Sequence, residues 1–325
     1  MLALMEITSW HWVGFIGCVV FFLALDLGVF HREAHVVSIK EASLWTTLWV
    51  SLSLLFAVGL RFARGSEESL EFVTGYLIEL SLSMDNVFVI ALIFAYFRVP
   101  AEHQHRVLFW GIMGALVMRG VMIAAGAALV QRFMWTLYIF GAFLLITGVK
   151  MLFASEEGVH PEKNVLLRLA RKLFPVSRDF QGQRFFTRVN GQRALTPLML
   201  VLLMVETTDL IFAVDSIPAI FAVTQKPFIV FTSNVFAILG LRSMYFLLAG
   251  AMRYFRYLKV GLAIVLMFIG CKMLVDPHGN EPTYWFQVHI PISLSLGIVA
   301  AIILSSVALS LLVLKSQKAQ TADDR

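Results

Sequence analysis

Five acidic side chains lie inside long apolar stretches, where a membrane helix would ordinarily carry none. Glu79 and Asp85 belong to FVTGYLIELSLSMDNVFVIALIF (72–94), and Glu206, Asp209 and Asp215 belong to VLLMVETTDLIFAVDSIPAIFAV (201–223). An acid at the centre of a membrane helix costs about 2.5–3.5 kcal/mol on insertion scales. We therefore expect these acids to be paired with bases, to carry protons or to bind a cation.

Oxygen atoms dominate the polar groups beside these acids. Asn86 follows Asp85, Ser216 follows Asp215, and neither stretch contains His or Cys. Carboxylate, amide and hydroxyl oxygens suit hard cations such as Mg²⁺, Ca²⁺ and Mn²⁺ better than Cu⁺ or structural zinc. The sequence therefore predicts an intramembrane metal site with these ligands: Glu79, Asp85, Asn86, Glu206, Asp209, Asp215 and Ser216.

Two arginines supply the main alternative interpretation. Arg119 and Arg242 lie in apolar runs and are expected to hold the carboxylates in place, while Asp26 adds a charge near the end of the first run. Ion pairing alone would make the acids structural. Two bases cannot neutralise five acids, however, and ionisable residues inside a membrane mark ion pathways by default. This surplus favours metal or proton traffic.

Helix geometry places a condition on such a site. At 100° per residue, Glu79 and Asn86 share a helix face, whereas Asp85 is rotated by about 120° from Glu79. A straight helix would not aim all three at one point. Because Ser, Thr and Pro218 accompany the acids, we predict that both acidic helices are locally unwound, which would let the two stretches converge near the membrane midplane.

The composition is that of a membrane protein. The chain has 325 residues, of which 59% are hydrophobic and 14% charged, whereas soluble domains are near half apolar and a quarter charged. Apolar runs of about 20 residues recur along its length. We predict an all-α polytopic membrane protein with about nine transmembrane helices, at residues 10–30, 43–61, 70–97, 107–130, 134–153, 195–224, 228–250, 257–275 and 289–314.

Basic residues predict the orientation. Lys and Arg crowd the segments that face the cytoplasm if the N-terminus lies outside, above all the 154–194 loop. The positive-inside rule then predicts a cytoplasmic C-terminus. Within the loop, VLLRLARKLF (165–174) has the spacing of an amphipathic helix on the inner leaflet, and the pair Asn190-Gly191 indicates a hairpin turn.

Three smaller features carry structural predictions. The stretch from Glu102 to His105 reads as a solvated cytoplasmic loop. Lys150 and Lys272 lie near the ends of apolar runs and are expected to extend to the membrane surface. The glycines of the 107–130 run are expected to permit close helix packing.

The chain also contains an internal repeat. SMDNVFVIALIF (83–94) aligns with AVDSIPAIFAVT (213–224), and ITGVKML (146–152) aligns with FIGCKML (268–274). Glu79 then matches Asp209, and Arg119 matches Arg242. Each copy holds three spans, so the second copy must enter the membrane from the opposite side, which predicts an inverted three-plus-three helix repeat. The predicted division is 1–69 (two helices), 70–153 (first repeat), 154–194 (basic loop), 195–275 (second repeat) and 276–325 (last helix and tail).

The motifs closely resemble those of the TerC family, in particular its Alx-like branch. The resemblance rests on FVTGYLIELSLSMDNVFV, YIFGAFLLITGVKM, ETTDLIFAVDSIPAIFAVT and FAILGLRSMYFLLAG and covers nearly the whole chain. It implies manganese export, a link to alkaline and metal stress, and a bacterial inner membrane. It also implies that the seven predicted ligands named above are the family's acidic motif residues.

The predicted function is export of a divalent metal, Mn²⁺ first among candidates, by alternating access with protons as a coupling ion. Alternatives are a Ca²⁺ or other cation/proton antiporter, a channel, and a non-transporting membrane stress or assembly factor. No nucleophile–base constellation suggests an enzyme. The expected partners are the metal ion, protons and the lipid bilayer, with a homodimer permitted, no nucleic acid and no tightly bound cofactor. The two cysteines, Cys18 and Cys271, are expected to be packing residues.

Overall fold

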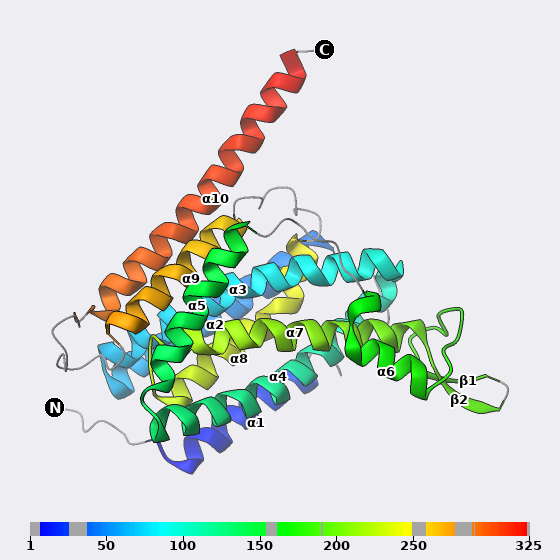
Figure 1. Cartoon of the computed structure of the whole chain (residues 1–325), viewed down its shortest axis with the longest axis horizontal. Coiled ribbons are helices and arrows are strands. Elements are labelled where there is room, and N and C mark those ends of the chain that lie inside the picture. The colour runs from blue at the N-terminus through cyan, green and yellow to red at the C-terminus, as the bar shows by residue number, and fades with distance from the viewer. Residues whose placement is uncertain are drawn as a thin grey trace.

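The computed structural model describes residues 7–25, 38–153, 161–189, 191–248, 258–276, 288 and 290–323. Long helices make up most of it, and they run side by side in a bundle (Figure 1). The elements are α1 Ser9–Leu25, α2 Ile39–Arg64, α3 Ser66–Phe97, α4 Ala101–Arg132, α5 Thr136–Phe153, the short 3-10 helix η2 Pro161–Lys163, α6 Val165–Leu173, β1 Phe186–Val189, β2 Gln192–Leu195, α7 Pro197–Phe221, α8 Pro227–Leu248, α9 Leu258–Val275 and α10 Ile292–Asp323.

Eight helices in the described part of the chain are long and apolar enough to cross a membrane: α2, α3, α4, α5, α7, α8, α9 and α10. They confirm the predicted all-α polytopic architecture. The first predicted span, 10–30, corresponds to α1, which is apolar but only 17 residues long where the structure describes it. Charged residues lie mostly at helix ends, which is where membrane helices tolerate them.

Short turns connect the helices that carry the predicted site. Gly65 alone separates α2 from α3, and its φ of 98° is a left-handed conformation that favours glycine. At the other end of α3, Arg98 adopts a left-handed conformation with φ 51°, and Pro100 precedes α4. The turn at Gly65 lets α3 pack back against α2, whereas α4 packs against α7 and α8.

Helix α8 is the centre of the bundle, with 89% of its most apolar stretch buried. It packs against α3, α2 and α4, while α7 packs against α4 and α3. Helices α5 and α9 form the most extensive helix pair. Their backbones approach closely at glycines: a Cβ added to Gly270 would lie 2.8 Å from the carbonyl oxygen of Gly141, and one added to Gly148 would lie 2.8 Å from that of Ala263.

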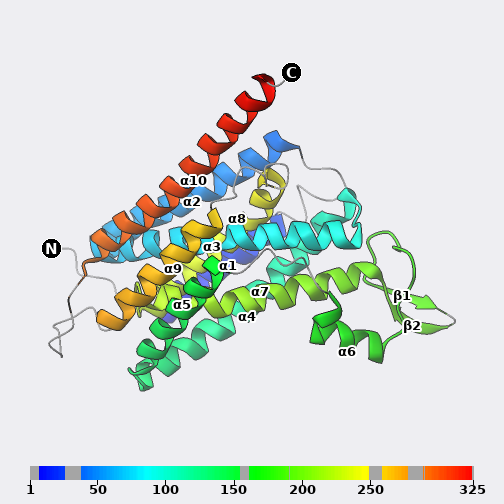
Figure 2. The same cartoon turned by 45° about the horizontal axis from the view of Figure 1, so that its top comes forward.

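The predicted basic loop forms a small unit at one end of the bundle. Helix α6 and the hairpin lie together there in both views (Figures 1 and 2). The strands pair antiparallel with Val189 opposite Gln192, which confirms the hairpin, although Asn190 of the predicted turn lies outside the described residues. Helix α6 confirms the amphipathic pattern, because Val165, Leu169 and Leu173 are exposed along one side. The far half of α10 extends away from the other helices in both views.

Two local predictions are wrong. Helices α3 and α7 are continuous through their acidic stretches, because the hydroxyls of Ser81, Thr207 and Thr208 bond backbone carbonyls of their own helices. This i−4 bonding satisfies the hydroxyls without opening a turn. The segment from Glu102 to His105 is also not a loop: it forms the first turn of α4, with His103 buried.

Candidate functional site

A buried arginine occupies the middle of the bundle. Arg119 of α4 is 2% exposed and lies between Glu79 of α3 and Asp209 of α7. Its Nη1 donates to Glu79 Oε1, its Nη2 donates to Asp209 Oδ1 at 2.8 Å, and its Nε donates to Asp209 Oδ2 at 3.2 Å. The paired geometry on Asp209 is the bidentate form in which arginine binds carboxylates most strongly. The structure therefore joins acids from both predicted repeats through one base.

Two predicted neutral residues complete this centre. Asn86 Nδ2 donates to Asp209 Oδ1 at 3.2 Å, and Arg119 Nη1 donates to Ser216 Oγ at 3.3 Å. We call Glu79, Asn86, Arg119, Asp209 and Ser216 the central cluster. One positive charge here faces two carboxylates, so the cluster retains a formal negative charge when both acids are ionised.

Three buried oxygens along one face of α3 have no hydrogen-bond partner among the described residues. They are Glu79 Oε2, Ser83 Oγ and Asn86 Oδ1. Positions i, i+4 and i+7 share a helix face, and the three residues are 0%, 1% and 3% exposed. Buried polar atoms are nearly always satisfied, and each exception calls for an explanation such as an ion or water. Three acceptors in line next to Asp209 match the requirement of a hard cation for oxygen ligands.

Ser83 was not predicted as a ligand. In the sequence it is one of several hydroxyl residues that favour unwinding, although its spacing of four from Glu79 and three from Asn86 was a usable signal. Ser81 is the contrasting neighbour, because its hydroxyl donates to Leu77 O at 2.6 Å. The difference between these two serines is visible only in the structure.

A small void adjoins the central cluster. It measures about 20 Å³ and is lined by Arg119, Asp209 and the apolar side chains of α3, α4, α7 and α8. A volume of about 10–15 Å³ on this measure holds one water molecule. The void is therefore large enough for a single water or a largely dehydrated ion beside Asp209.

Glu206 lies one turn before Asp209 on α7 and rests against α4. A Cβ added to Gly114 would lie 1.9 Å from Glu206 Oε1, so only glycine leaves room for this carboxylate. The predicted role of the α4 glycines in close packing is thus confirmed at Gly114. It is confirmed also at Gly111, where an added Cβ would lie 3.2 Å from Val205.

The other predicted acids do not join the central cluster. Asp85 of α3 lies within the electrostatic reach of Lys259 of α9, and Asp215 of α7 is influenced by Thr147 and Lys150 of α5. In the described ranges, no three His, Cys, Asp or Glu side chains come together as a ready-made metal site. The seven predicted residues thus form one centre with outlying acids, because the continuous helices keep Asp85 and Asp215 on other faces.

Arg242 is not among the described partners of Glu79 and Asp209. Its Nη1 lies 3.2 Å from Nε2 of His105, and the salt bridges of the central acids go to Arg119. The reason is the helical first turn of α4, which brings His105 next to α8. Asp26, the other supporting charge, lies outside the described residues.

A second charged group lies at the start of α3 and was also missed. Lys226 Nζ lies 3.2 Å from Glu71 Oε2 and 3.4 Å from Glu68 Oε1, and Arg64 Nη2 donates to Glu68 Oε1 at 2.8 Å. Glu68 and Glu71 are buried. The signal was the spacing of Glu68, Glu71 and Glu79, which places all three within about 80° around α3.

The fold and the buried ionisable centre define an integral, multi-pass membrane protein with a polar site among its helices. The model of the "Integral membrane protein TerC family" matches residues 64–318. The chain belongs to the TerC family.

Similar proteins cover almost the full chain. It is 53% identical over 312 residues to an uncharacterized membrane protein of Myxococcus xanthus, covering 96% of this chain and 94% of the relative. It is 50% identical over 301 residues to Alx of Escherichia coli (strain K12), covering 90% and 91%, and that protein is named as a candidate membrane-bound redox modulator. A membrane protein of Rickettsia bellii is 40% identical over 292 residues, covering 90% and 97%. No solved structure matches the chain at a significant level.

Proposed function

We propose that this TerC-family protein exports a divalent metal ion, with Mn²⁺ as its expected substrate, through the central cluster. The observation that carries the proposal is the row of unpartnered oxygens on α3, Glu79 Oε2, Ser83 Oγ and Asn86 Oδ1, next to Asp209. Each of these oxygens has lone pairs to offer, and a hard cation would take up all three as ligands. The metal ion is the substrate here rather than a resident cofactor.

We infer that Arg119 pairs with the two acids of the proposed site whenever no metal ion is bound there. Its guanidinium already pairs with both Glu79 and Asp209, so a metal ion has to displace it from one or both. Protons on the same carboxylates would likewise release Arg119. Metal, proton and arginine thus compete for two acids, and this competition is the physical basis for the proton coupling that we propose.

Reciprocal helix contacts support the inverted repeat. Under the alignment of the two copies, Gly148 matches Gly270 and Gly141 matches Ala263. The close contacts pair Gly141 with Gly270 and Gly148 with Ala263, as a two-fold axis between the copies would produce. Helix α3 packs on α8 as α4 packs on α7. We infer alternating access by movement of one copy against the other.

The proposed orientation follows from the basic loop. If α6 and the hairpin face the cytoplasm of a bacterial inner membrane, then the N-terminus and the end of the bundle that holds Lys226 face outward. The exposed apolar side of α6 would rest on the inner leaflet. We infer no enzymatic activity and no nucleic-acid partner.

The name of the Alx relatives raises a redox role as a second candidate. The sequence contains only two cysteines, Cys18 in α1 and Cys271 in α9, which are exposed and unbonded. Lone thiols in separate helices do not form the close pair that dithiol exchange uses. We infer that any effect on cellular redox state follows from the balance of metal ions.

The test is Mn²⁺ uptake into inverted membrane vesicles, with Ca²⁺ and Mg²⁺ as competitors. Asp209→Asn should abolish uptake, because it removes a charge from the central cluster while keeping the shape. The matched control is Asp179→Asn, which changes an acid in the loop unit between α6 and β1. Uptake by the wild type that survives Asp209→Asn would contradict the proposed site.

Wild-type protein that is folded and inactive in the same vesicles would contradict export itself. That outcome would favour a stress or assembly factor with structural acids. Uptake into right-side-out vesicles, with none into inverted ones, would instead reverse the direction of transport.

A further inference from the structure

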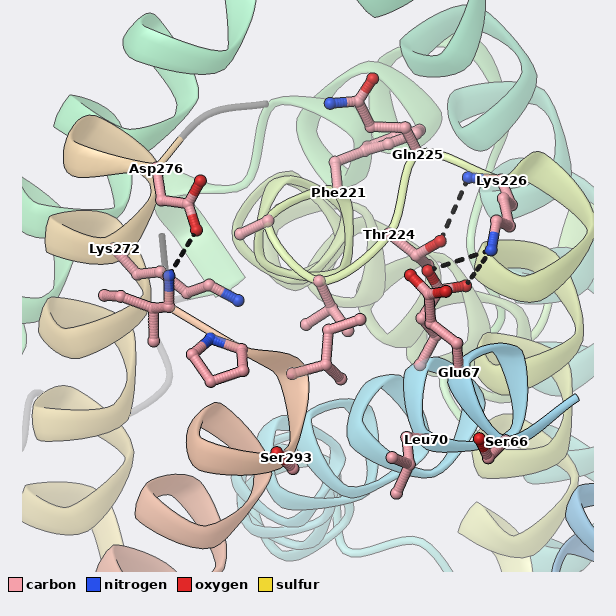
Figure 3. A pocket seen from close by; sticks show the side chains of 16 residues that line it. Ser66, Glu67, Leu70, Phe221, Thr224, Gln225, Lys226, Lys272, Asp276 and Ser293 are labelled. Atoms are coloured by element: carbon pink, nitrogen blue, oxygen red, sulfur yellow. Dashed lines mark hydrogen bonds and ion pairs between the residues drawn. The ribbon is translucent and has the colours of Figure 1, made fainter. Parts of the chain in front are cut away.

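A cavity of about 560 Å³ opens at the end of the bundle where α3 begins and α7 and α9 end (Figure 3). Charged side chains stand on its two walls. Glu67, Glu71 and Lys226 line one wall, and Lys272 and Asp276 line the other. Neither the predicted site nor the family assignment accounts for this cavity.

Lys272 is the unusual residue of the cavity. It was expected to extend to the membrane surface, but it is only 7% exposed and its side chain points into the cavity. Among the described residues it has no hydrogen bond and no salt bridge, and Asp276 is the acid whose charge reaches it. Its aliphatic stem is therefore buried among the helices, while its ammonium faces the cavity. Its presence here indicates that the cavity serves charged ligands.

Helix α3 connects this cavity to the central cluster. Glu71 lines the cavity, and Glu79 follows eight residues later, about 12 Å along the helix and rotated by about 80°. Gly75 stands between them, and a Cβ added there would lie 3.0 Å from Ser233 Oγ. Close packing of α3 on α8 at this point thus separates the cavity from the central cluster.

We propose that the cavity is the release vestibule of the transport path, and that Lys272 keeps its affinity for divalent cations low. This inference rests on the proposed function and adds a second, weak cation site at Glu71. A metal ion that passes Gly75 meets Glu71, where it competes with Lys226, whose Nζ lies 3.2 Å from Glu71 Oε2. The ammonium of Lys272 across the cavity adds to the repulsion. Efficient passage needs such a site to bind weakly enough that the ion leaves.

The first test measures Mn²⁺ binding to the purified full-length protein by calorimetry, in an Asp209→Asn background that removes the central site. Lys272→Met should tighten the remaining weak binding about tenfold, because a unit positive charge no longer opposes the ion. Lys40→Met, at the exposed start of α2, is the control for loss of a lysine and should change nothing. Glu71→Gln should abolish the weak binding.

Unchanged weak binding in Lys272→Met, or weak binding that survives Glu71→Gln, would overturn the proposal. This readout does not depend on transport, so it separates the vestibule from the proposed function. In wild-type background, Lys272→Met should also slow Mn²⁺ export several-fold, while tight binding at the central cluster is kept. Export at the wild-type rate would refute the role in release.

The second test asks which side the cavity faces. Thr224→Cys should react with a membrane-impermeant maleimide added to intact cells, and Mn²⁺ should slow the reaction. The background is Cys18→Ser with Cys271→Ser, which removes both natural thiols. Labelling only in inverted vesicles would place the cavity on the cytoplasmic side and overturn its assignment to release.

Discussion

Arg119 and Arg242 occupy matching places in the proposed repeat, and yet their described contacts differ. Arg119 is almost fully buried and bridges Glu79 of α3 and Asp209 of α7. Arg242 contacts His105 near the start of α4. The comparison teaches that two similar segments can share their helix packing while one of them supplies the base that binds Glu79 and Asp209.

The lysines of the matching motifs diverge in the same way. Lys150 is exposed at the end of α5, whereas Lys272 is buried and points into the cavity. The glycines of the same motifs do not diverge, since Gly148 and Gly270 both face the α5–α9 contact. The glycines of the two motifs are thus equivalent in their packing, and the lysines differ in their burial.

The largest expected effect distinguishes the two arginines. Arg119→Gln should destabilise the protein by about 3–5 kcal/mol and stop Mn²⁺ uptake, because it leaves two buried acids without their base. Arg242→Gln leaves Glu79 and Asp209 paired with Arg119, so it should lose less Mn²⁺ uptake. Thermal unfolding in detergent measures the difference, and vesicle uptake measures function. Equal losses of stability and of Mn²⁺ uptake in both variants would contradict different roles for the two arginines.

The second prediction concerns the paired glycines. Gly270→Ala and Gly148→Ala should each destabilise the protein by about 1–3 kcal/mol, because the new methyl group would meet backbone atoms of the facing helix. Gly59→Ala is the control, since nothing lies within 4 Å of its added Cβ. A large loss for one member of the pair, with none for the other, would contradict the reciprocal packing.

The smallest expected effect sharpens the description of the site. Ser83→Ala should weaken Mn²⁺ binding by about fivefold, the loss of roughly one net polar interaction. It should not lower stability, because the Ser83 hydroxyl has no hydrogen bond to lose. Ser81→Ala, which does lose one, should leave binding unchanged. Calorimetry and thermal unfolding on both variants test this. Weaker Mn²⁺ binding by Ser81→Ala would contradict the assignment of Ser83 as the ligand.

Much of the site could be predicted from residue types alone. Acids, an amide and an arginine inside apolar runs are costly in a membrane, so their types and positions were enough to single out Glu79, Asp209 and Arg119. Residue spacing likewise predicted the amphipathic α6 and the hairpin. What remained out of reach was which of these groups meet.

The sequence by itself determined the long apolar helices, the buried charges and the matching motifs, because hydrophobic spacing and the cost of burial act residue by residue. Only the tertiary structure decided that Arg119 rather than Arg242 binds the acids, that Ser83 lacks a partner and that Lys272 turns inward. Those outcomes depend on which helix faces meet, and side chains far apart in the chain settle that together.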